Sequence, residues 1–578
     1  MKKKSMIRLL TNKITVIGYW LLVIGATVAC SDWTDHYEAD SSLQETQQQT
    51  LWENIASSSN LTQFKSLLQK TGYDAVLNTT QTYTVWAPAD GSYDYETLST
   101  LSNSRLLREF IENHVARNNY PASGLVEKKL YTVNEKVMHF NGNQQYTMQG
   151  VAVSKPNVNT HNGILHVLNG KIPFMANIYE SLNNNDFPID SIANYYHSFD
   201  ERELNEYKSV QGPIVDGAIT YLDSIFDERN DLYSLTYAYI NREDSNYTMI
   251  VPTNEAWTKA KEHVKQYYQY LPSFEYVEAI EGIKLTKTNI TIRDLDSLSE
   301  ATVNNMILYD LFYNNNLYDN KKLKTLQTGQ TLRVDSLYST LGTKIYSEDA
   351  ANLLEGAVRY DKSNGAMWIT DSLRMQPWHT WNPELVIQAE GNVMDAGNVS
   401  EAKRVYIQSG TQNPDVIGHV SRDTYLDLPP VAKGASPYAT FSLPGVRSTT
   451  YNIYIVTVPG NILSNYYESL PYSFRVSMGY VNEAGKNKDR DRAWCIESQF
   501  VSDPTRVDTI YLGEFTFPMA YYGMGNYHPY FKVENYIKSS FGENYDPNLR
   551  IDCIILRPKE LDLYLKEHPD YKYDRGIY

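Results

Sequence analysis

The sequence predicts a multidomain α+β protein that ends in an all-β sandwich. Three observations lead to this prediction. The chain has 578 residues, which is long enough for about three or four separately folded domains. Two sequence motifs each occur twice, far apart along the chain. After residue 384, apolar residues at helical spacing give way to short alternating segments with turns between them, which is typical of a β-sandwich.

The repeat is carried by two pairs of motifs. The segment NGILHVLNG at 162–170 is echoed by NGAMWITD at 364–371, and YTVWAPAD at 83–90 is echoed by YTMIVPTN at 247–254. Each segment of the first pair begins with Asn-Gly, which favours a tight turn, and continues as an alternating strand. We therefore expect one structural unit to be present in two copies.

These motifs resemble those of the fasciclin domain. The first copy has the family's order: a strand with an Ala-Pro turn at 83–88, a helix at 106–115 that contains His114, and the Asn-Gly-Ile strand at 162–170. The second copy is more divergent, with LFYN at 311–314 where the first has ENHV at 112–115. The resemblance implies two fasciclin-like α+β domains and a structural, hydrogen-bonded role for His114.

The expected domain boundaries follow from this resemblance and from composition. The first fasciclin-like domain is expected at 51–182 and the second at 213–383, where wider motif spacing indicates insertions near 267–276 and 323–352. The polar stretch 183–212, rich in Asn, Asp and Tyr, is interpreted as a linker.

Composition excludes one class of partner and singles out one residue type. The chain carries 68 acidic and 52 basic side chains, and a net charge of −16 argues against nucleic acid, whose phosphates attract Lys and Arg. Tyrosine is abundant, with 48 residues against 16 Phe. Because tyrosine combines an apolar ring with a polar tip, it suits either a hydrated core and surface in a β-rich protein or a binding face for partners and sugars.

The N-terminus has the features of an export signal. A basic leader is followed by an apolar run at 14–29 and then by Cys30. This pattern resembles a bacterial lipoprotein signal at 1–29, although Thr27 stands where that family prefers Leu. An ordinary secretory signal or an N-terminal anchor helix are the alternatives. Acylation of Cys30 would anchor the chain in the outer membrane, and several acyl chains would hold it firmly, because a single chain binds a membrane only marginally. Residues 30–50 would then be a polar tether between the membrane and a surface-exposed protein.

Residues 384–560 are expected to form the β-sandwich, and 561–578 a charged, Tyr-rich tail. The expected strands are 404–408, 438–443, 451–458, 472–478, 507–516 and 549–556. The segment at 549–558 resembles the closing strand of galactose-binding-like jelly rolls, which include many carbohydrate-binding modules. The mixed-charge run 486–492 is interpreted as a solvated turn. Cys495 and Cys553 either pair or remain buried free thiols.

Two aromatic clusters are candidate binding sites. The first is a glycan site in which aromatic rings alternate with Gly and Asn, and it comprises Trp494, Tyr521, Tyr522, Tyr527, His528 and Tyr530. The alternative for this loop is packing against the sandwich. The second cluster, Trp378 and Trp381, is either a platform for a partner protein or a wedge between domains.

Searches for catalytic and cofactor motifs lead to the expectation of a non-enzymatic protein. The sequence has no GxSxG elbow, P-loop, Rossmann glycine pattern, HExxH or CxxC. We therefore expect no catalytic residues, no metal site and no cofactor. With the lipoprotein-like leader, the fasciclin resemblance suggests an accessory glycan-binding component of a Sus-type nutrient-uptake system in Bacteroidetes. The alternative is a docking or adhesion subunit whose fasciclin domains bind proteins, such as the importer itself. A third hypothesis, a hydrolase of unrecognised type, is disfavoured by the absent motifs.

Overall fold

The computed structural model describes residues 48–183, 186–215, 217–277, 287–464, 468–537 and 543–573. The expected signal at 1–29, Cys30 and most of the tether lie outside these residues. The chain divides into two compact units: Met1–Met175 with Arg202–Glu228, and Ala176–Glu201 with Arg229–Tyr578. Within the described ranges, every helix is too short or too polar to span a membrane.

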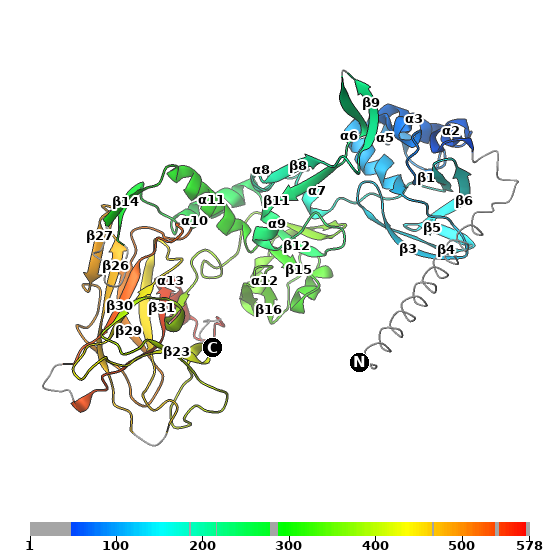
Figure 1. Cartoon of the computed structure of the whole chain (residues 1–578). Coiled ribbons are helices and arrows are strands. Elements are labelled where there is room, and N and C mark those ends of the chain that lie inside the picture. Colours follow the sequence, from blue (N-terminus) through cyan, green and yellow to red (C-terminus); the bar gives the residue numbers. More distant parts are fainter. Residues whose placement is uncertain are drawn as a thin grey trace, which may run out of the picture. The chain divides into compact units, whose positions relative to one another are not determined.

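The first unit combines short helices with one large sheet (Figure 1). Its elements are α2 Leu51–Ser57, α3 Thr62–Thr71, α4 Tyr73–Leu77, β1 Tyr83–Pro88, α5 Tyr95–Thr100, α6 Asn103–Leu106, the π-helix η3 Leu107–Ile111, the 3-10 helix η4 Glu112–His114, β2 Val115–Arg117, β3 Leu125–Tyr131, β4 Val137–Asn143, β5 Gln145–Met148, β6 Val151–Thr160 and β7 Gly163–Leu168. The seven strands are ordered β2-β1-β7-β6-β5-β4-β3, and β1 and β7 run parallel.

Side chains from β1 and β7 enter two apolar cores. Val85 and Leu165 pack with the helices, against residues such as Phe64 and Phe110. Trp86 points the other way and packs with Phe140 of β4. Because successive side chains of a strand alternate between faces, these two buried strands read as continuous apolar runs.

A two-part ribbon also groups largely with the first unit. Its strands are β8 Asp200–Leu204, β9 Val210–Val215, β10 Ala218–Asp223 and β11 Phe226–Asn230, with β9 paired to β10 and β8 paired to β11. We expected residues 213–223 to begin the second domain, and this expectation was wrong. The second unit instead begins at Ala176, well before the ribbon.

The second unit opens with another α+β region. Its elements are α7 Ile178–Leu182, α8 Asp190–His197, α9 Asp231–Thr236, β12 Tyr247–Pro252, α10 Asn254–Lys265, β13 Ser273–Val277, β14 Lys287–Thr291, α11 Leu295–Leu308, β15 Phe312–Asn314, the 3-10 helix η5 Tyr318–Lys324, β16 Ser336–Tyr338, β17 Lys344–Tyr346, α12 Ser347–Leu353, β18 Val358–Lys362 and β19 Gly365–Thr370. Four strands form its main sheet in the order β15-β12-β19-β18, and β13–β14 and β16–β17 are separate two-stranded pairs.

The expected linker at 183–212 is also corrected. Ile192 and Tyr196 of α8 are fully buried in the core of the second α+β region. Ile178 of α7, which we had placed in the first domain, belongs to the same core. The apolar positions of these short helices are separated by polar residues, which gave the segment the composition of a linker.

The same strand arrangement recurs in the two α+β regions. Tyr83 of β1 lies beside Gly163 of β7 in parallel register, and Tyr247 of β12 lies beside Gly365 of β19 in the same way. In each region a short third strand, β2 or β15, pairs antiparallel with the other edge of the first. The repeated motifs in the sequence therefore correspond to repeated strand pairs in the structure.

The side chain of Asn162 forms hydrogen bonds with three backbone groups at the start of β7. Its Oδ1 accepts from the backbone N–H of Leu51 at 2.7 Å. Its Nδ2 donates to the carbonyl oxygens of Leu77 at 2.9 Å and Thr79 at 2.6 Å. This buried amide thus joins the first helix of the unit, the end of α4 and the central strand pair.

Asn364 makes the equivalent contacts at the start of β19. Its Oδ1 accepts from the N–H of Ile178 at 3.0 Å. Its Nδ2 donates to the carbonyl oxygens of Ile240 at 2.6 Å and Arg242 at 3.1 Å. The following glycine, Gly365, has a φ of 141°, and a Cβ there would lie 1.8 Å from the carbonyl oxygen of Tyr247. The Asn-Gly pair is therefore required by side-chain hydrogen bonding and by close backbone approach.

The rest of the second unit is sandwich-like. Its elements are β20 Leu385–Gln388, the 3-10 helix η6 Ala389–Gly391, β21 Val393–Gly397, β22 Lys403–Tyr406, the 3-10 segment η7 Ser421–Asp423, β23 Thr424–Leu428, β24 Tyr438–Ser442, β25 Thr450–Thr457, β26 Ser473–Val481, β27 Asn487–Asp491, β28 Phe500–Val501, β29 Asp508–Thr516, β30 Tyr530–Asn535, β31 Leu549–Pro558 and α13 Lys559–Glu567. Each of the six strands expected from the sequence is present.

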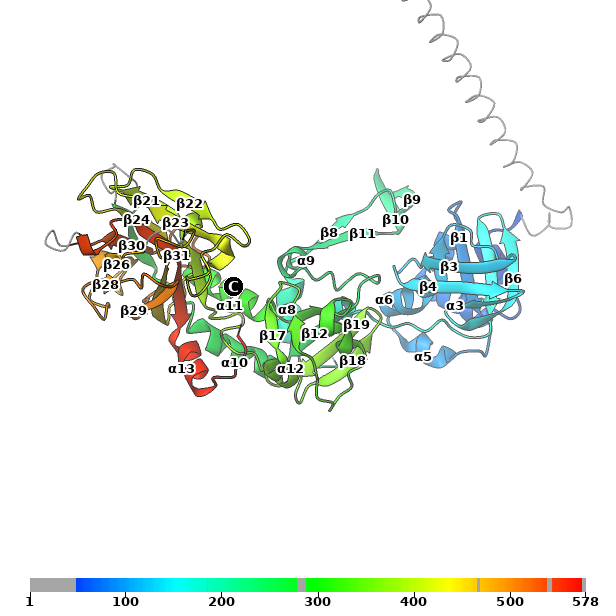
Figure 2. The same ribbon diagram turned by 90° about the horizontal axis from the view of Figure 1, so that it is seen from below.

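Two sheets share one apolar core in this region (Figure 2). One has the order β22-β23-β31-β25-β29 with β20 also paired to β31, and the other has the order β21-β24-β30-β26-β27 with β28 also paired to β26. The core includes Ile453 and Ile554 from the first sheet and Val476 and Phe531 from the second. Phe274 of β13 joins it, so an insertion of the α+β region contributes to the neighbouring core.

Two further expectations for this region were wrong, and one question is answered. The run 486–492 contains strand β27, which pairs with β26, and is not a solvated turn. Helix α13, Lys559–Glu567, extends into the tail expected at 561–578, and its Leu561 is fully buried. Cys495 and Cys553 are both free thiols.

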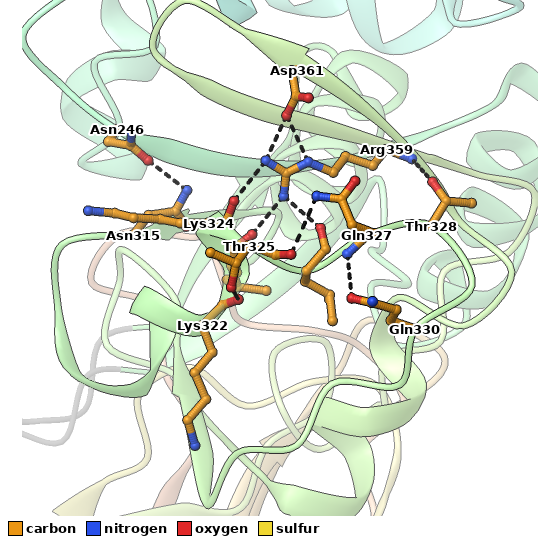
Figure 3. Close-up of polar contacts among 12 residues, drawn as sticks. Asn246, Asn315, Lys322, Lys324, Thr325, Gln327, Thr328, Gln330, Arg359 and Asp361 are labelled. Carbon is orange, nitrogen blue, oxygen red and sulfur yellow. Dashed lines mark hydrogen bonds and ion pairs between the residues drawn. The ribbon is translucent and has the colours of Figure 1, made fainter.

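An arginine orders the insertion that follows β15 (Figure 3). Nη1 of Arg359 donates to the carbonyl oxygens of Leu323 and Leu326, both at 2.8 Å, and Nη2 donates to the carbonyl oxygen of Lys324 at 3.0 Å. Its Nε donates to Asp361 at 2.8 Å. Arg359 is therefore difficult to replace by another residue, because its guanidinium donates to three backbone carbonyl groups near the end of η5.

Replacing Arg359 with lysine is expected to loosen this insertion. An ammonium group lacks the planar fork that reaches three carbonyl groups and a carboxylate together, so we expect a loss of roughly 2 kcal/mol in local stability. Faster hydrogen exchange at 318–330 would show it. Arg374→Lys, at an exposed ion pair with Glu355, is the matched control and should leave exchange there unchanged.

Candidate functional site

A groove of about 1050 Å³ lies between three helices of the second α+β region. One wall comes from α8, another from α10 and the segment that follows it, and the third from α11. Thr253 caps α10 through a hydrogen bond from the N–H of Ala256, and Asp294 caps α11 through one from the N–H of Ser297. These caps fix where both helices begin, and so position the groove-lining side chains of their first turns.

Aromatic rings form the apolar part of the groove. Tyr195 of α8 and Trp257 of α10 lie with ring centroids 6.1 Å apart. Tyr268 and Tyr270, just after α10, line the same groove. Aromatic side chains of this kind offer flat apolar faces and edges to a ligand.

Hydroxyl, amide and carboxylate groups surround these rings. Ser191 and Ser299 are half-buried, and the exposed members are Asn194, Thr258, Glu262 and Ser297. Deeper in the groove the Tyr195 hydroxyl donates to Oδ1 of Asn305 at 2.7 Å. Asn304 also lines the groove, and its Oδ1 is buried without a hydrogen-bond partner.

Two ionisable groups of the groove, Glu300 and Tyr195, each keep one protonation state at neutral pH. A hydrogen bond from Lys261 lowers the pKa of Glu300 in spite of partial burial, so this carboxylate stays ionised at neutral pH. Burial, with a smaller contribution from Glu300, raises the pKa of Tyr195 to about 12, so its hydroxyl stays protonated. A general acid at neutral pH needs a carboxyl group with a raised pKa, and these two groups do not provide one.

No motif in the sequence predicts this groove directly. Its polar residues are common serines, threonines and asparagines, and they come from helices separated by insertions. The insertion expected near 267–276 is a part of the sequence that contributes tyrosines to this groove. These tyrosines were open to two interpretations, a face for a partner or packing of the insertion on its own domain. Tyr267 itself is buried and its hydroxyl donates to Glu560 at 3.0 Å, whereas Tyr268 and Tyr270 reach the groove.

The predicted glycan cluster around 521–530 does not form one exposed face. Tyr521 is 2% exposed, lies in the sandwich core, and its hydroxyl accepts from the N–H of Val481 at 2.8 Å. Tyr530 is also buried and its hydroxyl donates to Asp489. The prediction that Tyr521 and Tyr530 bind glycan is therefore wrong. Both residues have structural roles, because neither ring is exposed to a ligand.

The other members of the cluster are half-buried packing residues. Tyr522 packs edge-on against Tyr268 at 5.7 Å, and Tyr527 packs edge-on against Tyr276 at 4.8 Å. His528 is half-buried, and burial lowers its pKa. The loop at 521–530 is therefore a packing element, which was the alternative to a glycan site. Much of this packing is against the α+β region.

Trp494 is likewise engaged within the sandwich-like region. Its Nε1 donates to the carbonyl oxygen of Asp491 at 3.0 Å, and its ring packs against Phe515 and Phe531. The indole is only half-buried, but these contacts fix its orientation. The structure does not bring Trp494 together with the other predicted residues into a shared binding surface.

Trp378 and Trp381 occupy the wedge position that was one of their two interpretations. Both are at most 5% exposed. Nε1 of Trp378 donates to the hydroxyl of Tyr571 at 2.9 Å, and the ring packs against Tyr564 of α13. The carbonyl oxygen of Trp381 accepts from Tyr268 at 2.8 Å. A platform for a partner protein is excluded by this burial.

Metal-binding chemistry is sparse in the part of the chain that the structure describes. No group of three or more His, Cys, Asp or Glu side chains there could hold a metal ion. The nearest approach is a set of buried oxygens without donors, from Gln388, Glu390 and Asp552. Burial raises the pKa of Asp552 to about 8, and the resulting O–H can satisfy one of these acceptors.

Comparison with known proteins identifies one domain. Residues 59–172, within the first unit, match the fasciclin domain, an adhesion-type, non-catalytic domain. The protein is thus a multidomain protein that contains a fasciclin domain. The comparison with curated proteins returned no match.

Two solved structures show distant likeness. The fasciclin domain pair of the insect cell adhesion molecule Fasciclin I is 11% identical, covers 56% of this chain and 98% of its own, and has a TM-score of 0.19. An exo-β-1,3-galactanase from Phanerochaete chrysosporium with bound β-1,3-galactotriose is 9% identical, covers 77% of this chain and 86% of its own, and has a TM-score of 0.17. At these TM-scores, neither likeness carries an argument about this chain.

Proposed function

We propose that the protein is a non-enzymatic cell-surface lipoprotein that binds glycan in the groove between α8, α10 and α11. The groove carries this proposal, because it combines aromatic rings with hydroxyl, amide and carboxylate groups. Sugars present C–H patches and hydroxyl groups, which need both kinds of contact. The leader that ends before Cys30 supports anchoring in the outer membrane, and a Sus-type uptake system of Bacteroidetes is the setting we infer.

Glycan binding is expected to weaken when exposed polar groups of the groove are removed. Asn194 and Thr258 line it from α8 and α10, and both are exposed. Loss of their hydrogen bonds to a ligand in the double variant N194A/T258A should weaken binding about tenfold. Calorimetric titration with whichever oligosaccharide binds best in a screen of plant and host glycans would measure the change.

The matched control removes the same side-chain types elsewhere in this region. Asn316 and Thr325 are exposed and lie outside the groove, so N316A/T325A should bind as the unmodified protein does. Equal affinity for both double variants would move the glycan site out of the groove. A screen that yields no binder at all would count against the glycan function itself.

Protein docking by the fasciclin domain is the second candidate function. It is favoured by the family match at 59–172, since fasciclin domains are adhesion-type domains. Copurification of membrane proteins that is lost when residues 48–175 are deleted would support it. The deletion should stop at Met175, because α7 belongs to the core of the second unit. Retained copurification would assign docking to the second unit instead.

A further inference from the structure

A second, smaller pocket lies in the sandwich-like region, on the sheet that contains β26 and β27. It measures about 330 Å³ and is lined by two arginines, Arg475 and Arg492, together with Cys495, Glu497 and Ser498. Arg475 belongs to β26, and the other four follow β27 in the chain. No residue of this pocket was a candidate binding residue in the sequence. Arg492 ends the mixed-charge run 486–492, and Arg475 stands in an otherwise uncharged strand segment.

In the part of the chain that the structure describes, no carboxylate forms an ion pair with the guanidinium of Arg475. Its guanidinium carbon lies 3.2 Å from the ring centroid of Tyr536, which fixes the plane of the group. Its Nε is buried and has no hydrogen-bond partner. Across the strand pair lies Glu534, but that carboxylate is already engaged by Arg492 and, at 3.6 Å, by Lys532. The stacked arginine is therefore held rigid with its donors unused.

Arg492 adds a second unused donor to the same pocket. Its Nη2 bonds to Glu534, whereas its Nε is buried without a partner. A buried charged N–H group without a partner is unfavourable, so both guanidinium groups retain unused hydrogen-bonding capacity. Both Nε atoms are closed to solvent, so a ligand in the pocket would approach the terminal nitrogens of the two groups. A carboxylate provides two oxygens in a plane, which matches guanidinium donors better than a single-atom anion does.

The other residues that line the pocket restrict the chemical class of the ligand further. Glu497 and Ser498 would accept hydrogen bonds from hydroxyl groups, which a simple inorganic anion does not supply. Burial raises the pKa of the Cys495 thiol to about 11, so the thiol stays neutral at neutral pH and adds no negative charge beside the arginines. The volume suits one sugar ring better than a peptide segment.

We propose that this pocket binds the carboxylate of an acidic sugar, a uronate residue, through Arg475 and Arg492, with the sugar hydroxyls on Glu497 and Ser498. The site is separate from the groove between α8, α10 and α11. It extends the proposed glycan binding to acidic glycans, but a neutral ligand in the groove would not depend on it.

The test compares an acidic and a neutral ligand on the full chain. Calorimetric titration with tri-galacturonate should show binding that weakens as salt is raised, whereas the matched neutral galactose trisaccharide should bind at least tenfold more weakly at this site. Arg475→Ala should weaken tri-galacturonate binding roughly tenfold or more, and Arg475→Lys should recover only part of it, because lysine keeps the charge but loses the fork.

Controls separate this inference from the proposed function. Arg506→Ala, at a 52% exposed arginine paired with Asp503 and Asp508, should bind as the unmodified protein does. Unchanged affinity of Arg475→Ala, with its thermal unfolding also unchanged, would overturn the uronate site. So would displacement of tri-galacturonate by sulfate at equal concentration, which would indicate an anion site without sugar recognition. Either result leaves N194A/T258A as the test of the groove.

Discussion

Replacing Asn364 with alanine is expected to lower the stability of the second α+β region by about 3–6 kcal/mol. The change leaves the N–H of Ile178 and the carbonyl oxygens of Ile240 and Arg242 without the partner that the amide supplies. The N–H of Ile178 loses its partner, which costs about 1–3 kcal/mol. The carbonyl oxygens of Ile240 and Arg242 keep donors from Tyr179 and Ser245, so each loses one hydrogen bond at about 1–1.5 kcal/mol, and the three losses together give the range. Asn162→Ala should have an effect of similar size in the first unit, since that amide bonds to Leu51, Leu77 and Thr79.

Hydrogen exchange measured by mass spectrometry can assign these losses to one unit at a time. Asn364→Ala should accelerate exchange in β12 and β19, and Asn162→Ala in β1 and β7. Asn143→Ala, at an exposed position of β4, is the control and should change neither pair. Losses below about 1 kcal/mol at both asparagines would show that the repeated amides are not what joins helix and strands in each copy.

Acid is expected to destabilise the first unit selectively, because it contains two buried neutral histidines. Burial lowers the pKa of His114 and of His166 from 6.5 to about 4 in each case. His114 bonds through Nδ1 to the carbonyl oxygen of Phe110 at 2.7 Å, and its Nε2 accepts from the N–H of Ile172 at 2.8 Å. His166 bonds through Nε2 to the carbonyl oxygen of Tyr120 at 2.9 Å. Neither ring can take a second proton without losing an acceptor.

The direction of the pH effect follows from which state binds more protons. Between pH 6.5 and about 4 the unfolded chain has protonated histidines while the folded unit does not, so stability falls as the pH falls through this window. A shift of this size corresponds to about 3 kcal/mol for each histidine, and the full stability is present above pH 6.5. Urea unfolding followed by exchange in β1 and β7 at several pH values would measure it.

A variant at an exposed histidine controls for general acid effects. His139→Gln, on β4, should show the same pH dependence as the unmodified protein. His166→Gln should remove part of the dependence even if its stability at neutral pH is lower, because glutamine does not titrate in this range. A first unit whose stability is constant from neutral pH to pH 4.5 would contradict the burial of both rings.

The repeated strands could be predicted from sequence because their determinants are local. An asparagine with a glycine after it, followed by alternating apolar residues, specifies β7 and β19 within a few positions. The strands of the sandwich-like region were predicted for the same reason. In both cases, side chains that alternate in sequence also alternate between faces, so the pattern and the structure have the same period.

The site could not be predicted in the same way. Aromatic composition drew attention to Tyr521, but composition does not tell whether a ring faces solvent or the core. That residue is buried, whereas the groove is lined by Asn194, Thr258 and Ser299, which are unremarkable in sequence. A groove between three helices depends on how distant segments pack, and on helix α8, which had the composition of a linker.

The return of the C-terminal segment has a consequence for how this chain can be recombined. Helix α13 and Tyr571 follow the last strand of the sandwich-like region, yet Tyr571 bonds to Trp378 and to Asp349 of the α+β region. A crossover at residue 383 that exchanged the downstream part for a foreign domain would also remove the cover of Trp378 and the partner of Asp349. The two regions therefore depend on each other for folding and should be exchanged together, even though each has its own sheets.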